Sequence, residues 1–454
     1  MKTMFWAKVK AAAAVAAVTV LGGGFVIHEL AAGEPADKAE RKGPLAALPS
    51  APGAHIEKIK ALGDNQWLNL GAPAADPKWG RSRGCTWGGK SMVLAPELRG
   101  AFRTGEGVHA YVKPDGFGHD DYWFYDINAH RWICLYPGTD TRNFKKQVQD
   151  GALKVDDVGR VVDASGQPIP GHLLIHAFGC ISYDTDLKKF GILQGAVFTR
   201  HFMPGLKAHG GEGLVDEGIA LLEKQGMNKA GHNFAPWAYN SLTGRFEREL
   251  AANATPRLGD PWPMYLYIPS KKEFFAAGPS CIAFFNPATR TWSPPVPNSA
   301  TPNGWVLGCY DSKRDRVYGG YLGFCYYDIK TNVITRISDG ATCPVCLNNN
   351  NNALVYDSGN DTILALAFTK FAGPNGIKYD QTGIFAFDPE TKTWREPIPF
   401  DAEFSSQIIK DYKEANAAFY DQELGVIFIY SAADSGDNGT MWVYKFKGRA
   451  AASK

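Results

Sequence analysis

The sequence predicts an all-β fold in which six four-stranded antiparallel sheets surround a central axis. Three observations predict it: a composition rich in turn-forming residues, a seven-residue spacing that recurs along the chain, and an incomplete repeat at the C-terminal end. The 454 residues include 49 Gly and 28 Pro, 13% are aromatic and 45% are hydrophobic. This composition is too apolar for a disordered chain and too rich in turn residues for a helical bundle.

The charge of the chain is nearly balanced. Lys and Arg number 48 and Asp and Glu number 46, which gives a formal net charge of +2. A balance this even provides no basic field that could gather phosphates over a large area. Nucleic acid is therefore not predicted as a partner, and contact with a membrane is predicted only through the N-terminal segment.

The N-terminal segment predicts export. Lys2, Lys8 and Lys10 precede an uncharged run over residues 11–27, as in targeting segments. The run is at the lower limit for crossing a bilayer, so residues 1–32 are interpreted as a signal peptide or a membrane anchor. Residues 33–54 contain four Pro and are interpreted as a linker. The remainder is then expected to be extracytoplasmic, whether periplasmic, secreted or anchored.

The first repeated element places a bulky apolar residue seven positions after an aromatic one. An Asp or Asn follows each aromatic directly, and such side chains cap tight turns. The pattern predicts a hairpin in which one strand ends at the aromatic and the next begins near the apolar residue. It occurs five times: Tyr125 with Trp132, Tyr239 with Phe246, Phe285 with Trp292, Tyr327 with Ile334, and Phe387 with Trp394.

A second element with the same spacing lies upstream of each hairpin. Four copies keep the Asp: Tyr183 with Phe190, Tyr310 with Val317, Tyr356 with Ile363, and Tyr420 with Ile427. Two weaker copies lack it: Tyr267 with Phe274, and Leu94 with Ala101. The flanking segments are short and rich in β-forming residues and Gly. Two hairpins in succession predict a four-stranded unit.

Six such units follow one another, at approximately residues 85–137, 172–250, 262–297, 304–338, 353–399 and 416–446. Blades of this kind arranged around an axis form a β-propeller, which protects the strand edges. The last unit lacks its fourth strand, and residues 65–71 resemble an outer strand without a blade. The N-terminal strand is therefore predicted to complete the last blade. The propeller is placed at residues 55–448, with a tail at 449–454.

The repeats resemble those of kelch-type propellers, which recur about every fifty residues. The shared hallmarks are a Tyr-Asp turn, paired glycines, and a Trp at a fixed distance from an aromatic-Asp pair. They match at Tyr310-Asp311, at Gly319-Gly320, and at Phe387-Asp388 with Trp394. Phe246 and Ile334 depart from the pattern, since each stands in place of Trp. The resemblance covers nearly the whole chain after about residue 60 and implies a binding platform or, in a minority similar to galactose oxidase, an enzyme.

Function is expected in the loops on one face of the propeller, because the repeated positions are used in packing and turns. Turns within each hairpin are uniformly short, whereas the connections on the opposite face vary. Tyr183 and Tyr239 of blade two are 56 positions apart, and Tyr310 and Tyr327 of blade four only 17. The face with the variable connections is therefore the candidate binding surface.

The insertion in blade two, residues 195–236, is the largest of these connections. Its apolar spacing, early acids and late Gly predict one short amphipathic helix within residues 212–226. The insertion also contains His201, His209 and His232. These could bind zinc or act as a base, but their spacing fits no compact ligand motif, and solvated loop histidines are the alternative. No His follows His232, which excludes a galactose-oxidase-like copper centre drawing imidazoles from late blades, and no metal or cofactor is predicted.

The chain has eight cysteines, which could form disulfides in an exported protein. Only Cys343 and Cys346 are closely spaced in an informative way, and they are interpreted as a local disulfide or as two loop thiols. Leu347 follows them, which argues against haem attachment. Cys309 and Cys325 lie among apolar residues and are interpreted as buried core thiols.

The remaining candidates for ligand binding are polar residues in the predicted variable loops. They are His119, Asp120, Asp121, Asn350, Asp434 and Asp437. The alternative for each is a solvated turn or a polar connector. Two functional hypotheses result. The preferred one is a non-catalytic binding or scaffold module that recognises a protein or a glycan, and the other is a carbohydrate-active hydrolase or lyase that uses carboxylates and a histidine from blades one and two.

Overall fold

The computed structural model describes most of the chain after residue 40. The described residues are 41–82, 92–104, 115–118, 121–156, 161–167, 179–194, 235–249, 251–253, 256, 258, 263–298, 304–347, 352–368, 370–372, 377–379, 381–407, 415–432 and 439–448, with 213, 217 and 220. The chain divides into two units, Met1–Ala39 and Glu40–Lys454, and all of the sheets belong to the second. The predicted signal peptide or anchor and the predicted tail lie outside the described residues.

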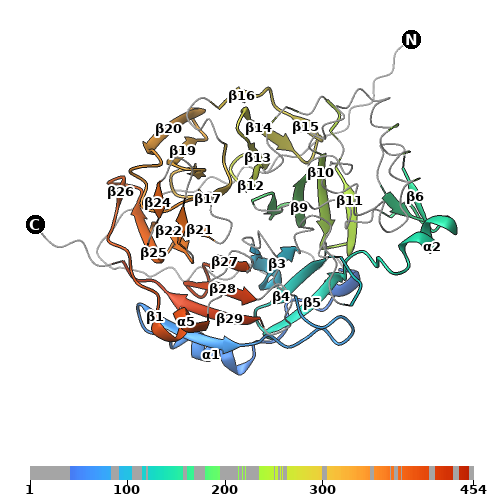
Figure 1. The fold of residues 1–454 in the computed structure, drawn as a ribbon, viewed down its shortest axis with the longest axis horizontal. Helices are drawn as coiled ribbons and strands as arrows, with labels where there is room; N and C mark the ends of the chain where they lie inside the picture. Colours follow the sequence, from blue (N-terminus) through green and yellow to red (C-terminus); the bar gives the residue numbers. More distant parts are fainter. Residues whose placement is uncertain are drawn as a thin grey trace, which may run out of the picture. The chain divides into compact units, whose positions relative to one another are not determined.

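Six antiparallel sheets form the blades of a β-propeller, as predicted (Figure 1). The strands of each blade are given from the innermost outward. Blade one has β2 (Met92–Ala95), β3 (Gly100–Thr104), β4 (Tyr122–Asp126) and β5 (Arg131–Tyr136), and blade two has β8 (Ile181–Asp184), β9 (Lys189–Gln194), β10 (Ala235–Asn240) and β11 (Arg245–Arg248). Blade three has β12 (Met264–Ile268), β13 (Glu273–Ala277), β14 (Cys281–Asn286) and β15 (Thr291–Trp292), and β16 (Val296–Pro297) also pairs with β14.

Blades four to six follow the same order. Blade four has β17 (Leu307–Asp311), β18 (Arg316–Gly320), β19 (Phe324–Asp328) and β20 (Val333–Ser338). Blade five has β21 (Ala353–Asp357), β22 (Thr362–Ala367), β25 (Gly383–Asp388) and β26 (Thr393–Trp394). Blade six has β27 (Ala415–Asp421), β28 (Val426–Ala432), β29 (Thr440–Lys445) and β1 (Gln66–Gly71). The first strand of each blade contacts the first strand of the next, from β2 through β8, β12, β17, β21 and β27 back to β2. The innermost strands therefore form a closed ring.

Short elements lie between or beside the blades. Two small hairpins pair β6 (Leu153–Val155) with β7 (Val161–Asp163), and β23 (Phe371–Ala372) with β24 (Lys378–Tyr379). The helices with given bounds are η1 (Gly43–Leu45), α1 (Ala54–Lys60), η2 (Pro96–Leu98), α2 (Phe144–Gln149) and α5 (Ala402–Gln407). No helix among the described residues is long and apolar enough to cross a membrane. Of the helix predicted in blade two, only residues 213, 217 and 220 are described, each in a helical conformation.

The seven-residue spacing corresponds to directly opposed residues on neighbouring strands. Tyr310 faces Val317 and Phe387 faces Trp394, and the other nine predicted pairs are also in register. The turn between them has four residues, and the fourth has a positive φ, as at Asp315 with φ 56°. The Asp or Asn after the aromatic caps this turn: Asp311 Oδ1 accepts the backbone N–H groups of Lys313 and Arg314. The predicted hairpins and the predicted cap are confirmed.

Apolar and aromatic side chains pack between neighbouring blades. Phe102 of blade one stacks on Phe190 of blade two, with ring centroids 4.7 Å apart. The hydrophobic cores likewise join residues of adjacent blades, as Val355 and Ile429 do for blades five and six. Because each blade buries its two sheet faces against its neighbours, no blade has a complete core of its own.

The N-terminal strand completes the last blade, as predicted. β1 pairs with β29, and Trp67 faces Tyr444 across the two strands (Figure 1). The Trp67 ring also stacks on Phe404 of α5, with centroids 4.4 Å apart. Strands from opposite ends of the chain therefore share one sheet, and this sheet closes the propeller.

The prediction of a linker at residues 33–54 is wrong for its second half. The propeller unit begins at Glu40, and Leu45 and Leu48 are buried in the core of blades one and two. Ser50 Oγ donates to the buried carboxylate of Asp126 at 2.8 Å. Leu45 and Leu48, three positions apart, pack this Pro-rich segment against the propeller core. Its composition alone did not indicate that contact.

His130 is expected to make the protein less stable in mild acid. Its ring lies beside His55, with centroids 5.4 Å apart, and its Nδ1 is 2.8 Å from the Tyr125 hydroxyl. Desolvation, and after it the charge of His55, lower the pKa of His130 to about 4. The unfolded chain binds this proton near pH 6.5, so the native state loses stability as the pH falls from about 6.5 toward 4. The loss should reach about 2 kcal/mol at pH 5.

Urea unfolding at pH 7 and pH 5 tests this expectation. His130→Asn removes the titrating ring, and Asn tolerates the left-handed φ of 49° at this position. The variant should lose less stability between the two pH values than the wild type. His55→Gln should reduce the loss only in part, because burial is the larger cause of the shift. An equal loss in wild type and His130→Asn would contradict the assignment.

Candidate functional site

The two ends of the blades differ in what their polar residues do. We call the end that carries the four-residue hairpin turns the turn face, and the opposite end, with the long connections, the loop face. Blades two, five and six show the contrast, since their second and third strands are joined by residues 195–234, 368–382 and 433–439. Only part of the loop face is described, so its contacts are taken from the strand ends and the loops that the structure does describe.

Polar contacts join each blade to the next on the turn face. Tyr183 donates to Glu97 between blades two and one, and Tyr267 donates to Asp186 between blades three and two. Ser270 donates to Asp315 at 2.7 Å between blades three and four. The other three junctions are Arg314 with Asp361, the Gly359 N–H with the Tyr420 hydroxyl, and Arg99 with Asp421. These six contacts form a closed ring of polar links.

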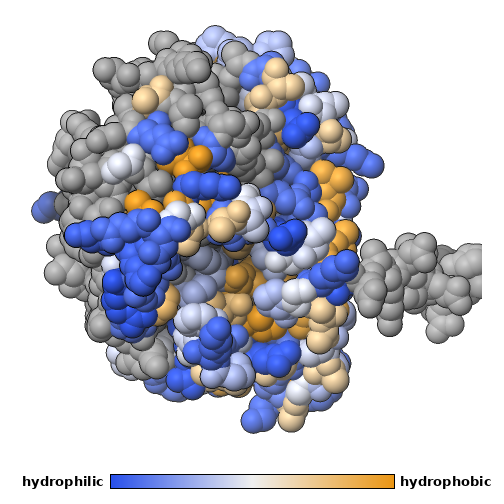
Figure 2. Space-filling model, turned by 90° about the vertical axis from the view of Figure 1, so that its right-hand side faces the viewer, coloured by the Kyte–Doolittle hydropathy of each residue, from blue (hydrophilic) through white to orange (hydrophobic). Residues whose placement is uncertain are grey.

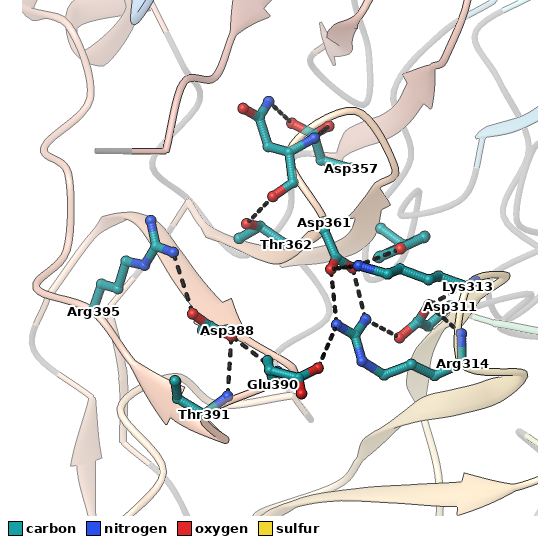
Figure 3. Close-up of polar contacts among 12 residues, drawn as sticks. Asp311, Lys313, Arg314, Asp357, Asp361, Thr362, Asp388, Glu390, Thr391 and Arg395 are labelled. Carbon is teal, nitrogen blue, oxygen red and sulfur yellow. Dashed lines mark hydrogen bonds and ion pairs between the residues drawn. The ribbon is translucent and has the colours of Figure 1, made fainter. Parts of the chain in front are cut away.

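Arg314 is the centre of the strongest of these links (Figure 3). Its guanidinium donates to Asp361 at 2.7 and 2.8 Å, to Asp311 at 2.9 Å and to Glu390 at 3.3 Å. Arg314 is 11% exposed and Asp311 is fully buried. The hydrogen bonds from Arg314 hold the pKa of Asp361 well below its usual range. Arg314 therefore holds blades four and five together through the carboxylates of both.

Buried charged residues lie on the loop face between blades six and one. Arg103, at the end of β3, is 1% exposed, and Asp121, just before β4, is 3% exposed. Arg103 donates to the Ser82 hydroxyl at 2.5 Å and lies over the Tyr430 ring at 5.2 Å. The indole of Trp123 donates to Asp121 at 2.7 Å. We call these five residues the Arg103 cluster. It holds one buried cation and one buried carboxylate, and such charges are costly to bury unless they are paired or hydrogen-bonded.

A second polar pair lies at the same end of blade six. Asn416 on β27 faces Ser431 on β28, and both are buried. No described residue forms a hydrogen bond with the side-chain atoms of Asn416 or with the Ser431 hydroxyl. A buried polar group left in this way costs about 1–3 kcal/mol. A bound water or ligand atom would remove that cost.

An aromatic pair, the exposed Trp79 and the half-buried Phe117, lies at the loop-face end of blade one. Residues 74–80 run beside β5: Ala74 bridges to Arg131, and Asp76 accepts the backbone N–H of Cys134 at 3.1 Å. Trp79 therefore reaches the end of the blade, where its ring meets Phe117 edge to face at 5.5 Å. Trp79, Leu187 and Val333 are the exposed large hydrophobic residues in the described part of the chain.

Among the residues drawn in colour in Figure 2, hydrophobic residues form small patches between larger hydrophilic areas. Small patches of this kind are normal on a soluble protein. Leu187 belongs to a hairpin turn, and Val333 begins β20 directly after one. Trp79 is instead held on the face that sequence analysis marked as the candidate binding surface.

The structure places one of the predicted loop-face residues in a site. Asp121 belongs to the Arg103 cluster. The others lie outside the described residues: His119, Asp120, His201, His209, His232, Asn350, Asp434 and Asp437. Among the residues that are described, no three His, Cys, Asp or Glu side chains are grouped so that they could hold a metal.

The local disulfide considered for Cys343 and Cys346 is not formed. Cys343 is a buried thiol that donates to the Val345 carbonyl at 3.1 Å, and burial raises its pKa. The thiol therefore points into the core of blades four and five rather than toward its neighbour in the loop. Cys309 and Cys325 are buried thiols on blade-four strands, as predicted.

Sequence reasoning missed Arg103, Ser82, Trp79 and Asn416. Arg103 and Asn416 lie in strands whose neighbours are apolar, and a single polar residue there gives no repeat or motif to detect. A signal did exist for Trp79, since a Trp beside Lys and Gly just after the closing strand follows no repeated position. Arg314 was also missed, because it lies in a hairpin turn that the spacing marked as purely structural.

Comparisons with known proteins do not assign the chain to a family. No family model and no curated protein matches the chain. A fungal alcohol oxidase of the AA5 family in complex with copper matches with a TM-score of 0.42 and 10% identity, over 84% of this chain and 76% of that one. A chain of a mitotic checkpoint complex matches with a TM-score of 0.40 and 9% identity, over 94% and 100%.

An extracellular domain from B. thetaiotaomicron, described as part of a hybrid two component system, gives a TM-score of 0.39 and 12% identity. The match covers 83% of this chain and 39% of that one. Similarities this weak carry no argument about activity. The six-bladed architecture rests on the order of the sheets themselves.

Proposed function

We propose that this protein is an exported, non-catalytic binding or scaffold module of the kelch type that recognises a protein or a glycan through its loop face. The observation that carries the proposal is the difference between the two faces. On the turn face a polar contact links each blade to the next, as Arg314 links blades four and five. On the loop face Arg103, Asp121 and Asn416 lie at the strand ends of blades one and six, next in sequence to the long connections.

A carbohydrate-active enzyme gains less support from the described residues. Burial raises the pKa of two carboxyl groups of blade two, Asp184 and Glu249. Asp184 is a hairpin cap, and Glu249 forms an ion pair with Lys189 at 2.7 Å. Asp184 therefore lies at the turn face, away from the variable loops, and Glu249, which follows β11, is engaged by Lys189. A glycosidase needs its pair of carboxyl groups beside the sugar.

The proposal is tested by probing glycan and peptide arrays with the full chain and with a loop-face variant. Gln194 and Ala235 are cross-strand partners, so a short Gly-Ser connector can replace residues 195–234 and keep β9 and β10 paired. We expect the variant to unfold within a few degrees of the wild type and to lose most of its array signal. Val333→Asp, on a turn-face residue that is 52% exposed, should keep the wild-type signal.

Two results would contradict the proposal. One is the absence of binding to any glycan or peptide at micromolar protein concentration. The other is a signal that survives the loop replacement but is lost in Val333→Asp, which would place recognition on the turn face.

A further inference from the structure

We infer that Trp79, Phe117 and Arg142 form a subsite for one neutral sugar ring of a glycan, at the loop-face end of blade one. The inference rests on the proposed function and narrows it to one class of ligand and one place. It is carried by three observations: an aromatic ring held in an exposed position, hydrogen-bond donors that bond to none of the described residues, and an arginine whose charge faces carboxylates.

The exposed position of Trp79 is fixed by the backbone. Asp76 Oδ1 accepts the N–H groups of Lys78 and Trp79, at 2.9 and 3.0 Å, and Asp76 pairs with Gly80. The other oxygen of Asp76 is bound to β5. Trp79 thus stays 36% exposed on a short, anchored turn, although a Trp side chain gains much free energy from burial. Because the segment that carries this ring is already ordered, ligand binding costs little additional conformational entropy.

Arg142 is held over the neighbouring ring. Its guanidinium carbon lies 4.7 Å from the centre of Phe117, and its Nε donates to Asp140 at 2.9 Å. Gly116 makes room for it, because a Cβ at this position would lie 2.5 Å from the Arg142 Cδ. Neither terminal nitrogen of Arg142 donates to a residue that the structure describes, and the side chain is 55% exposed. Two donors beside an aromatic pair are therefore open to a ligand.

The chemistry of these groups matches a neutral sugar better than an acid. A sugar ring has an apolar face of C–H groups that can lie on an indole and an edge of hydroxyls that accept and donate hydrogen bonds. The positive charge of Arg142 faces Asp140 and is also near Asp115, so its guanidinium offers directional donors without a net positive field for an anion. Lys78 lies over the Trp79 ring at 4.6 Å and is exposed, so a ligand can displace it at a cost of about twofold to fivefold in affinity.

Titration calorimetry with soluble neutral oligosaccharides tests the inference. The probes are the hexasaccharides of cellulose, starch, chitin, xylan and mannan, each titrated into the full chain. At least one should bind, and Trp79→Ala should weaken it about tenfold or more, as expected for an aromatic anchor. Arg142→Met should weaken it several-fold through the lost hydrogen bonds. Lys78→Ala should leave it unchanged or tighter, whereas an acidic ligand would bind this variant more weakly.

The matched control is Leu187→Ala. Leu187 is also apolar and exposed, at 37%, but it lies on the turn face. It should bind like the wild type, and melting curves should be alike for all four variants because the changed side chains are exposed. The subsite would be wrong if Trp79→Ala bound the oligosaccharide as tightly as the wild type while the loop replacement in blade two abolished binding. The proposed function would still hold in that case. Binding of peptides but of none of the hexasaccharides, with loss in Trp79→Ala, would overturn the sugar and assign the surface to a protein partner.

Discussion

Deletion of residues 60–72 is expected to expose the outer edge of blade six and to make the protein aggregate. The deleted segment contains β1, the outer strand of blade six, and without it the backbone groups of β29 have no partner on that side. An exposed strand edge pairs readily with other chains. The contact is also anchored at its start, because the Asn65 N–H donates to the Lys445 carbonyl at 2.7 Å and Asn65 Oδ1 accepts from the Tyr444 hydroxyl at 3.0 Å.

A point variant separates the lost edge from lost packing. Trp67 contacts Phe400, Phe404 and Tyr444, so Trp67→Ala should lower the free energy of unfolding by about 3 kcal/mol while keeping the strand pairing. Gln66→Ala, in the same strand but exposed, should cost less than about 1 kcal/mol. Light scattering and thermal unfolding measure the two effects. A deletion variant that stays monomeric with an unchanged melting temperature would refute closure by β1.

The propeller itself was predictable because its main signal is local and repeated. Tyr310 and Val317 are opposed in the sheet, and the seven-residue spacing that joins them states both the turn length and the register. Closure by residues 65–71 followed from counting strands, since one blade lacked a strand and one strand lacked a blade. Such features need no knowledge of how the blades pack.

The site was much less predictable, because it depends on contacts between distant parts of the chain. Arg103 meets Tyr430, more than three hundred positions away, and no spacing connects them. Asp121 was found only because it lies in a run of acids at the start of a strand. Leu45 and Leu48 were assigned to a linker, since Pro-rich composition says nothing about a buried groove that accepts two side chains. No local sequence pattern identifies a residue whose contacts lie in a different blade.

The second large effect is expected at Arg314, which links blades four and five on the turn face. Arg314→Met would leave Asp311 and Asp361 without the guanidinium that binds both. Removing one partner of a mostly buried ion pair leaves an uncompensated charge, so the free energy of unfolding should fall by about 3 kcal/mol at pH 7. Lys313→Met is the matched control: Lys313 also contacts Asp361 but is 63% exposed, so its loss should cost less than about 1 kcal/mol.

The pH dependence of this loss gives an independent check. Arg314 lowers the pKa of Asp361 in the folded state, so the stabilisation is fully present above the carboxyl's unfolded pKa of about 4. It is lost as the pH falls below that value toward the lower pKa of the folded state. The difference in stability between wild type and Arg314→Met should therefore be largest at neutral pH and shrink in acid. A difference that is constant from pH 7 to pH 3 would show that Arg314 acts through packing alone.

A double-mutant cycle then assigns the energy to the pair. Asp361→Asn in the Arg314→Met background removes one of the two carboxylates that lose the guanidinium, so the double variant should recover part of the stability that Arg314→Met loses. An interaction energy of about 1–3 kcal/mol is expected for groups in direct contact. If the two losses simply add, the ion pair between blades four and five contributes nothing of its own, and the turn-face ring would be a consequence of blade packing rather than one of its causes.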